Sequence, residues 1–391
     1  MKKYIYSLLF LCASLTGCTQ GIQHNSVPES LTNSVKPISG EMVRVWGDIT
    51  SEDKLAMVAE KLAQHRGQSE EKNMLALSGG GANGAFGAGV LAAWTESGQR
   101  PDFDLVTGIS TGAIISVFAY LGSQYDYEII DFYTNYTDSD LFRKKSLFSI
   151  FHSTSLLDIE PFEQMVRDTI TPELLSKVAS KHDSGKYLLI GTTNLDTQRL
   201  SVWNMGAIAK IGSVASEQLF ENIILASTAV PGAMPAVQID VMYNGKIYQE
   251  IHVDGGVARQ VFLFPDSWDI SSIANRNQNN LNIYVIRNGE FLPHWAQTEM
   301  TLHSVAARSL DTIIKYQGRS DVIQIYQQSL AAGGKFFFSH IDSGFQIEKD
   351  PTLQFDQYYM QALYQHGYHL METDKLWHRE PPIFGTQKIN K

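Results

Sequence analysis

Short apolar runs alternate with segments of helical periodicity from residue 73 onward. Residues 74–77 form an apolar run that stops at three glycines, as expected for a buried parallel strand. A helical pattern follows at 85–96, and a second strand (103–107) and helix (113–121) repeat the same order. Repeated strand–turn–helix units predict an α/β fold: a three-layer arrangement with a central, mostly parallel sheet and helices on both faces.

The rest of the chain continues this mixed pattern. Apolar runs predict strands at 187–192, 199–203, 246–253 and 281–286, and the first two suit a hairpin. Helical spacing predicts helices at 219–226, 301–331 and 355–371. We therefore expect a core over residues 73–262 and a C-terminal portion, 263–391, in which a strand and helices pack on that core.

The first residues have the pattern of an export signal. Lys2 and Lys3 precede an apolar run at 4–15, which is shorter than the roughly 20 residues that span a bilayer. Residues 15–18 (LTGC) resemble the lipobox of bacterial lipoproteins. The resemblance implies that 1–17 is a signal peptide and that Cys18 carries the lipid; an ordinary secretory signal with an incidental cysteine is the alternative. The residue after the cysteine is Thr19 and not an aspartate, which resembles the pattern of outer-membrane rather than inner-membrane lipoproteins.

Two segments separate this signal from the predicted core. Residues 18–50 are rich in Ser, Asn, Pro and Gly, which is typical of a flexible tether. Residues 51–72 include apolar positions at helical spacing and predict an N-terminal helix. We expect the body of the protein to lie in water beside the membrane that anchors it.

Charge and cysteine content narrow the possible chemistry. The chain has a formal net charge of −10, and loss of the signal would remove two further positive charges. Such an acidic chain argues against a nucleic-acid partner. Cys12 lies in the signal and Cys18 is the lipid-attachment candidate, so neither a disulfide nor a cysteine metal site is expected. We expect no metal and no cofactor, and no protein partner can be inferred.

A candidate nucleophile follows the second predicted strand. Residues 108–112 (GISTG) lie between the strand at 103–107 and the helix at 113–121. A sharp strand-to-helix turn exposes the hydroxyl of Ser110, and Gly108 and Gly112 leave room for that turn. The helix N-terminus also favours the negative charge that develops during acyl transfer.

A glycine-rich turn precedes this element. Residues 78–84 (SGGGANG) place Gly79, Gly80 and Gly81 after the first strand, where backbone N–H groups can approach an anion. One interpretation is an oxyanion hole, another is a dinucleotide-binding loop, and a third is a structural turn. The dinucleotide interpretation requires an acid at the end of the next strand. Asp102 and Asp104 lie at its start, which disfavours that interpretation.

The third candidate motif is Asp254-Gly255-Gly256, directly after the strand at 246–253. Alone, this motif is most often a turn. It gains importance because a serine nucleophile needs a neighbouring group that accepts its proton.

Together and in this order, the three motifs resemble the patatin-like phospholipase family. Its glycine-rich motif matches 79–84, including Gly84, its serine motif matches 108–112, and its D-G-A/G motif matches 254–256. The resemblance covers about residues 73–259. It implies a Ser110 nucleophile, an Asp254 base, oxyanion donors at Gly79 to Gly81, and hydrolysis of lipid esters through a covalent acyl-enzyme. Asn83 departs from the family, many of whose members carry Arg or Lys there.

Three alternatives stay open at the level of sequence. A Ser-His-Asp hydrolase would need a histidine base, for which the candidates are His252, His303, His340, His366 and His369. A catalytically inert lipoprotein on the same fold is the second alternative, and a nucleotide-dependent oxidoreductase is the third. Residues 141–151 combine apolar and basic side chains, which suits either a lid or ordinary packing.

Overall fold

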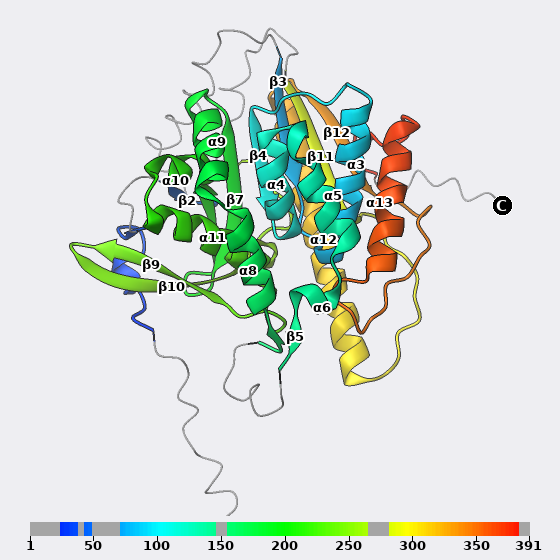
Figure 1. Cartoon of the computed structure of the whole chain (residues 1–391). Helices are drawn as coiled ribbons and strands as arrows, with labels where there is room; N and C mark the ends of the chain where they lie inside the picture. The colour runs from blue at the N-terminus through cyan, green and yellow to red at the C-terminus, as the bar shows by residue number, and fades with distance from the viewer. Residues whose placement is uncertain (1–23, 38–42, 49–70, 146–154, 265–280, 383–391) are drawn as a thin grey trace, which may run out of the picture.

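One mixed β-sheet runs through the centre of the molecule (Figure 1). The computed structural model describes residues 24–37, 43–48, 71–145, 155–264 and 281–382. The sheet comprises β1 (Lys36–Pro37), β2 (Arg44–Trp46), β3 (Lys72–Leu77), β4 (Leu105–Ile109), β7 (Tyr187–Asn194), β8 (Arg199–Asn204), β9 (Val237–Tyr243), β10 (Lys246–Asp254), β11 (Leu281–Glu290) and β12 (Lys335–Ile341). A separate two-stranded sheet pairs β5 (Arg143–Lys144) with β6 (Leu157–Asp158).

The central strands are parallel, in the order β7-β4-β3-β11-β12. Beyond β7 the pairings are antiparallel: β7 pairs with both β8 and β10, and β10 pairs with β9. The hairpin of β9 and β10 extends away from the body in Figure 1. These pairings confirm the predicted α/β fold with a mostly parallel sheet.

Helices cover both faces of the sheet. They are α3 (Gly84–Glu96), α4 (Thr111–Leu121), α5 (Asp126–Asn135), α6 (Asp138–Leu141), α8 (Glu160–Thr169), α9 (Pro172–Asp183), α10 (Met205–Ile211), α11 (Val214–Thr228), α12 (Leu302–Ala331) and α13 (Gln357–Glu372). The 3₁₀ turns are η1 (Glu29–Leu31), η2 (Gly81–Asn83), η3 (Ser123–Tyr125) and η4 (Gly255–Val257). No helix in the described ranges is long and apolar enough to cross a bilayer.

Side chains of β3 alternate between two cores, which explains why both faces are covered. Leu75 and Leu77 pack in the core beneath α3, α4 and α13, whose helices lie in front of the parallel strands in Figure 1. Met74 and Ala76 pack in the opposite core, which includes Val322 of α12. Since successive strand residues face opposite sides, an unbroken apolar run has to be buried on both.

Most predicted elements are present with shifted ends. The strand predicted at 103–107 is β4, which continues to Ile109 because Gly108 and Ile109 pair with β7. The strands at 187–192 and 199–203 form the predicted hairpin as β7 and β8. Strands β9 and β12 and helices α5, α8, α9 and α10 were not predicted from the sequence.

The predicted tether needs a correction. Within 18–50, β1 pairs with β9 and β2 pairs with β8, so these residues belong to the sheet. Their polar composition misled the prediction because each strand contributes only two or three residues. The predicted signal peptide with Cys18, residues 51–70 of the predicted helix and residues 146–151 of the 141–151 segment lie outside the described residues. The helix predicted to end at residue 72 does not reach that far, because Lys72 begins β3.

Candidate active site

Ser110 and Asp254 meet because strand β7 changes partner along one edge. Its first half pairs with β4, ending with Ile109 opposite Gly191. Its second half pairs with β10, beginning with Asp254 opposite Thr192. The carboxyl ends of β4 and β10 therefore meet head to head beside β7, and Ser110 directly follows β4.

Ser110 occupies a strained turn between β4 and α4. Its φ of 54° and ψ of −125° lie in a region that residues with a side chain rarely adopt. A Cβ atom at Gly108 would collide with the Gly112 carbonyl oxygen, so the turn requires glycine there. The Ser110 N–H donates to Ser227 Oγ at 3.0 Å, which anchors the turn to α11.

The Ser110 hydroxyl donates to Asp254 Oδ2 at 2.6 Å, and both side chains are buried. The other carboxylate oxygen, Oδ1, accepts the Gly256 N–H at 2.6 Å. Burial raises the pKa of Asp254 to about 6, although the hydrogen bonds from Ser110 and Gly256 oppose this shift. The carboxylate is therefore more basic than an exposed aspartate and lies in direct contact with the serine proton.

His252 is turned toward a different set of partners. His252 Nε2 lies 3.1 Å from Glu250 Oε2, and a carboxylate oxygen only accepts, so Nε2 carries the proton and donates. In the neutral ring Nδ1 then accepts from the Thr192 hydroxyl at 2.8 Å, and Thr192 Oγ1 accepts from Trp203 Nε1, also at 2.8 Å. Burial lowers the pKa of His252 against the opposing effect of Glu250, which keeps the ring neutral.

The other candidate histidines also lie away from Ser110. His340 Nδ1 contacts the Ile341 carbonyl oxygen, His366 pairs with Asp342, His369 pairs with Glu372, and His303 is exposed. Across the described ranges, no histidine is hydrogen-bonded to Ser110 or Asp254. The arrangement is a serine with a carboxylate, without an imidazole between them.

The prediction of three oxyanion donors in the glycine turn is wrong for one of them. The Gly79 N–H donates to the Gln260 carbonyl oxygen at 3.0 Å, so this amide is already used. Gly80 and Gly81 are exposed and line the same pocket as Ser110 and Thr111. Gly81 has a φ of 56°, a conformation that favours glycine. Of the three predicted donors, Gly80 and Gly81 are those that face the serine pocket.

Residues 75–265 match the family model described as patatin-like phospholipase. This segment is a patatin-like phospholipase domain. Similar solved structures are VipD from Legionella pneumophila (13% identity, 78% of this chain and 67% of that chain, TM-score 0.38) and human GIVD cytosolic phospholipase A2 (10% identity, 86% and 65%, TM-score 0.38). The chain thus spans about two thirds of the length of each. No curated protein matches the chain in sequence.

The glycine turn of the patatin-like domain is held from the end of β11. Asn288 Nδ2 donates to the Ser78 carbonyl oxygen at 3.0 Å, and Asn288 Oδ1 accepts the Gly87 N–H at 3.1 Å. The Asn288 N–H donates to Ser78 Oγ at 2.8 Å. A Cβ atom at Gly80 would collide with the Asn288 carbonyl oxygen, so the turn lies directly against this residue.

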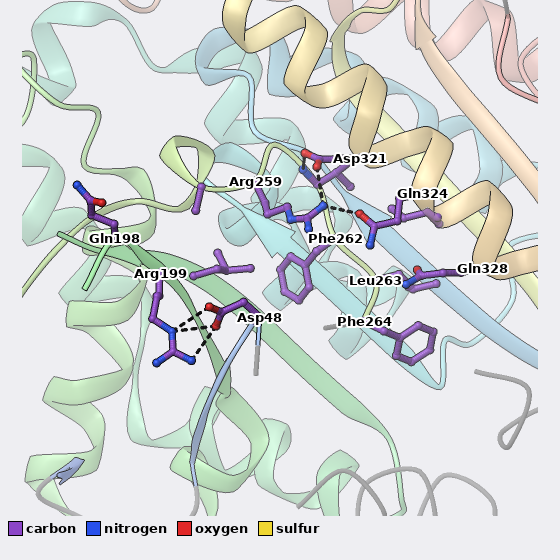
Figure 2. Close-up of a pocket in the computed structure, with 15 residues that line it drawn as sticks. Asp48, Gln198, Arg199, Arg259, Phe262, Leu263, Phe264, Asp321, Gln324 and Gln328 are labelled. Carbon is purple, nitrogen blue, oxygen red and sulfur yellow. Dashed lines mark hydrogen bonds and ion pairs between the residues drawn. The ribbon is translucent and has the colours of Figure 1, made fainter. Parts of the chain in front are cut away.

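A second support comes from α12, on the opposite face of the sheet. Asp321 Oδ2 accepts the Gln260 N–H at 2.7 Å, and its Oδ1 accepts from Arg259 at 3.0 Å. Figure 2 shows Asp321 and Gln324 of α12 reaching Arg259 across a small pocket. Since the Gln260 carbonyl oxygen accepts the Gly79 N–H, this contact connects α12 to the glycine turn.

An open pocket with a volume of about 400 Å³ leads to Ser110. Its lining is mostly apolar, with polar atoms near the serine; it comprises Gly80, Gly81, Ala82, Asn83, Ser110, Thr111, Ile114, Phe142, Leu157, Phe162, Thr228, Val230, Ala233, Met234, Lys349, Gln354, Phe355 and Tyr359. Asn83 Oδ1 accepts the Tyr359 hydroxyl at 2.7 Å. The pocket size and composition suit an extended apolar ligand with a polar end.

Sequence reasoning missed several residues of this site. Ser227, Asn288 and Lys349 reach it from other parts of the chain, and Gln260 lies just beyond the third motif. One signal was present: Asn288 follows the apolar strand predicted at 281–286, and the carboxyl ends of parallel strands gather at one edge of a sheet. Asp102 and Asp104 lie at the opposite end of β4, where Asp104 pairs with Lys72, away from the glycine turn.

Proposed function

We propose that this protein hydrolyses carboxylic esters of lipids through a covalent acyl-enzyme on Ser110. The contact of 2.6 Å between Ser110 Oγ and Asp254 Oδ2 carries the proposal. The patatin-like phospholipase domain and the apolar pocket support the lipid class of the substrate.

The proposed reaction has two balanced steps. Asp254 accepts the hydroxyl proton while Ser110 Oγ attacks the ester carbonyl, and the oxyanion is stabilised by the amides of Gly80 and Gly81. The tetrahedral intermediate expels the alcohol, which takes the proton from Asp254 and leaves an acyl-serine. Water then attacks the acyl group while Asp254 accepts its proton. Collapse of this second intermediate releases the carboxylic acid and returns the proton to Ser110.

Active-site labelling tests the nucleophile. A fluorophosphonate should label Ser110 in the wild-type protein, and Ser110→Ala should lose both the label and ester hydrolysis while its thermal unfolding stays cooperative. Asp254→Asn should lower turnover by about 10³-fold or more, because an amide cannot accept the serine proton.

A histidine substitution serves as the matched comparison. His252→Gln should retain most of its turnover per folded molecule, since His252 contacts Thr192 and Glu250 instead of Ser110. A folded His252→Gln protein as inactive as Ser110→Ala would replace the serine–aspartate mechanism by a triad.

We also propose that Cys18 anchors the protein to the bacterial envelope, with the outer membrane as its site. The LTGC motif at 15–18 supports this. Cys18→Ser should abolish incorporation of labelled palmitate, because Cys12 lies within the predicted signal and no other cysteine exists in the chain. Palmitate labelling that persists in Cys18→Ser would refute the anchor.

A further inference from the structure

The active-site pocket contains a cation that none of the three motifs includes. Lys349 lies in the connection between β12 and α13 and lines the pocket together with Gly80 and Ser110. It carries the single formal charge among the described residues of the lining; the polar neighbours are neutral, such as Asn83 and Gln354. Among the described residues of the lining, Lys349 is therefore the only source of positive charge.

The ammonium group of Lys349 has few partners within the protein. In the part of the chain that the structure describes, its Nζ has one hydrogen bond, to the Gln354 carbonyl oxygen at 3.5 Å, and no ion pair. That distance is at the long limit for a hydrogen bond. The residue is exposed, so a ligand can reach its side chain, and neighbouring atoms lower the pKa of Lys349 against the opposing charges of Asp138 and Asp356.

The two nearby carboxylates have other tasks. Asp138 Oδ1 accepts the backbone N–H groups of Gln354 and Phe355 at 2.8 and 3.1 Å, which fastens the connection to α6. Asp356 accepts the Asp350 N–H at 3.0 Å and caps α13 through the Tyr359 N–H at 3.2 Å. These carboxylates hold the backbone around Lys349, and among the described residues neither is paired with its ammonium group.

A cation in the lining of an apolar pocket is complementary to an amphiphile with an anionic group. We propose that Lys349 binds the phosphate of the substrate's headgroup and so selects phosphate-bearing acyl esters over neutral ones. This inference rests on the proposed ester hydrolysis at Ser110. The phosphate is not a reacting group, so the contact contributes equally to the bound substrate and to the transition state, and its loss raises KM more than it lowers kcat.

Binding to an inactive protein tests the inference without relying on turnover. The probes are 1-octanoylglycerol 3-phosphate and 1-octanoylglycerol, which share one acyl chain, used below their micelle concentrations with the Ser110→Ala protein. Lys349→Gln should weaken binding of the phosphate ester about tenfold and leave the neutral ester unchanged, and Lys349→Arg should keep most of the affinity. Lys375→Gln, at an exposed lysine beyond α13, is the matched control and should change neither.

Several results would overturn the assignment. Equal weakening of both esters by Lys349→Gln would show a structural effect, and an equal loss in Lys375→Gln would show a general charge effect. Inorganic phosphate that displaces the phosphate ester with comparable affinity would assign the lysine to free phosphate instead of a lipid headgroup.

Turnover by the protein with Ser110 intact separates this inference from the proposed function. Lys349→Gln should lower kcat/KM for the phosphate ester about tenfold, mainly through KM, while hydrolysis of p-nitrophenyl butyrate stays unchanged. Absence of hydrolysis of every ester, together with Lys349-dependent binding, would refute the enzyme but not the phosphate site. Hydrolysis of both octanoyl esters with an unchanged ratio in Lys349→Gln would refute the site but not the enzyme.

Discussion

The two carboxylate oxygens of Asp254 have separate partners, and this division determines how the residue responds to pH. Oδ1 accepts the Gly256 N–H, which fixes the plane of the group, and Oδ2 faces the Ser110 hydroxyl. Burial raises the pKa of Asp254 to about 6. Activity that depends on the ionised carboxylate should therefore rise through about pH 6, close to where an ordinary histidine titrates. A pH profile alone cannot distinguish the two kinds of base, and the substitutions at Asp254 and His252 can.

The same shift predicts that Asp254 lowers the stability of the fold at neutral pH. Its folded pKa lies above the unfolded value, so the native state binds more protons, and stability is lost as the pH rises through about 4 to 6. Asp254→Asn removes this cost. The variant should gain about 1–3 kcal/mol in the free energy of unfolding relative to wild type when the pH rises from 4 to 7.5.

Urea unfolding of both proteins at the two pH values measures this difference. Asp321→Asn is a suitable comparison, because Asp321 is also buried with a raised pKa but pairs with Arg259. It should lose stability at neutral pH, since the substitution removes the negative charge that pairs with Arg259. If Asp254→Asn destabilises the protein equally at pH 4 and at pH 7.5, the ionised Asp254 carboxylate does not lower the stability of the wild-type fold.

The sequence predicts the position of a residue where contacts within a short motif determine its local geometry. Ser110 lies in a local turn whose glycines are required by contacts within a few residues, so sequence spacing was enough to predict the turn, and the role of Ser110 as nucleophile stays a prediction. The Gly79 donor was mispredicted because its partner, the Gln260 carbonyl oxygen, is distant in sequence. Lys349 has no local signature, since its position depends on two aspartates that hold the backbone around it.

At the scale of elements, the end of β11 is as much a part of the site as the end of β4. Asn288 bonds to Ser78 on one side and to Gly87, at the start of α3, on the other. It therefore fixes the glycine turn between β3 and α3. The strand β11 was predicted, but its final residues were not, because the apolar pattern stops at Ile286 while pairing with β12 continues.

Asn288→Ala should lower both turnover and stability. It leaves the Ser78 carbonyl oxygen and the Gly87 N–H without partners in a buried site, which costs about 2–4 kcal/mol in the free energy of unfolding. The glycine turn loses its support, and kcat should fall about 10- to 100-fold as the oxyanion donors shift.

Asn282→Ala is the matched control for this prediction. Asn282 lies at the other end of β11, is also buried, and bonds to Asn73 away from the glycine turn. This variant should lose stability while kcat per folded molecule stays near wild type. Equal falls in kcat for the two variants would contradict a specific role of Asn288 in positioning the turn. Urea unfolding and ester hydrolysis at saturating substrate measure the two quantities.

At the scale of the whole molecule, residues 24–37 and 43–48 belong to the folded body. Asn25 Nδ2 donates to the Ile247 carbonyl oxygen at 2.6 Å, and β1 extends the sheet beside β9. Arg44 of β2 forms an ion pair with the buried Glu250, which also accepts from His252. Burial alone would raise the pKa of Glu250, but the hydrogen bond from His252 and the charge of Arg44 outweigh it and hold that pKa below its ordinary value. Sequence composition could not reveal this, because the few apolar residues that the segment buries, such as Val35 and Val43, are isolated among polar ones, and their partners are distant in sequence.

Two truncations should therefore behave differently, although both lack Cys18. A chain that begins at residue 24 retains β1, β2 and Arg44, and it should unfold cooperatively with the stability of the longer protein. A chain that begins at residue 49 exposes the edges of β8 and β9 and leaves Glu250 buried without its cation, which costs about 3–5 kcal/mol. Thermal unfolding followed by circular dichroism, together with size-exclusion chromatography, measures both the stability and the association expected of exposed strand edges.

Glu250→Gln in the shorter chain removes the unpaired charge and should recover part of the lost stability. If the two truncated proteins unfold at the same temperature and stay monomeric, residues 24–48 act as a tether after all.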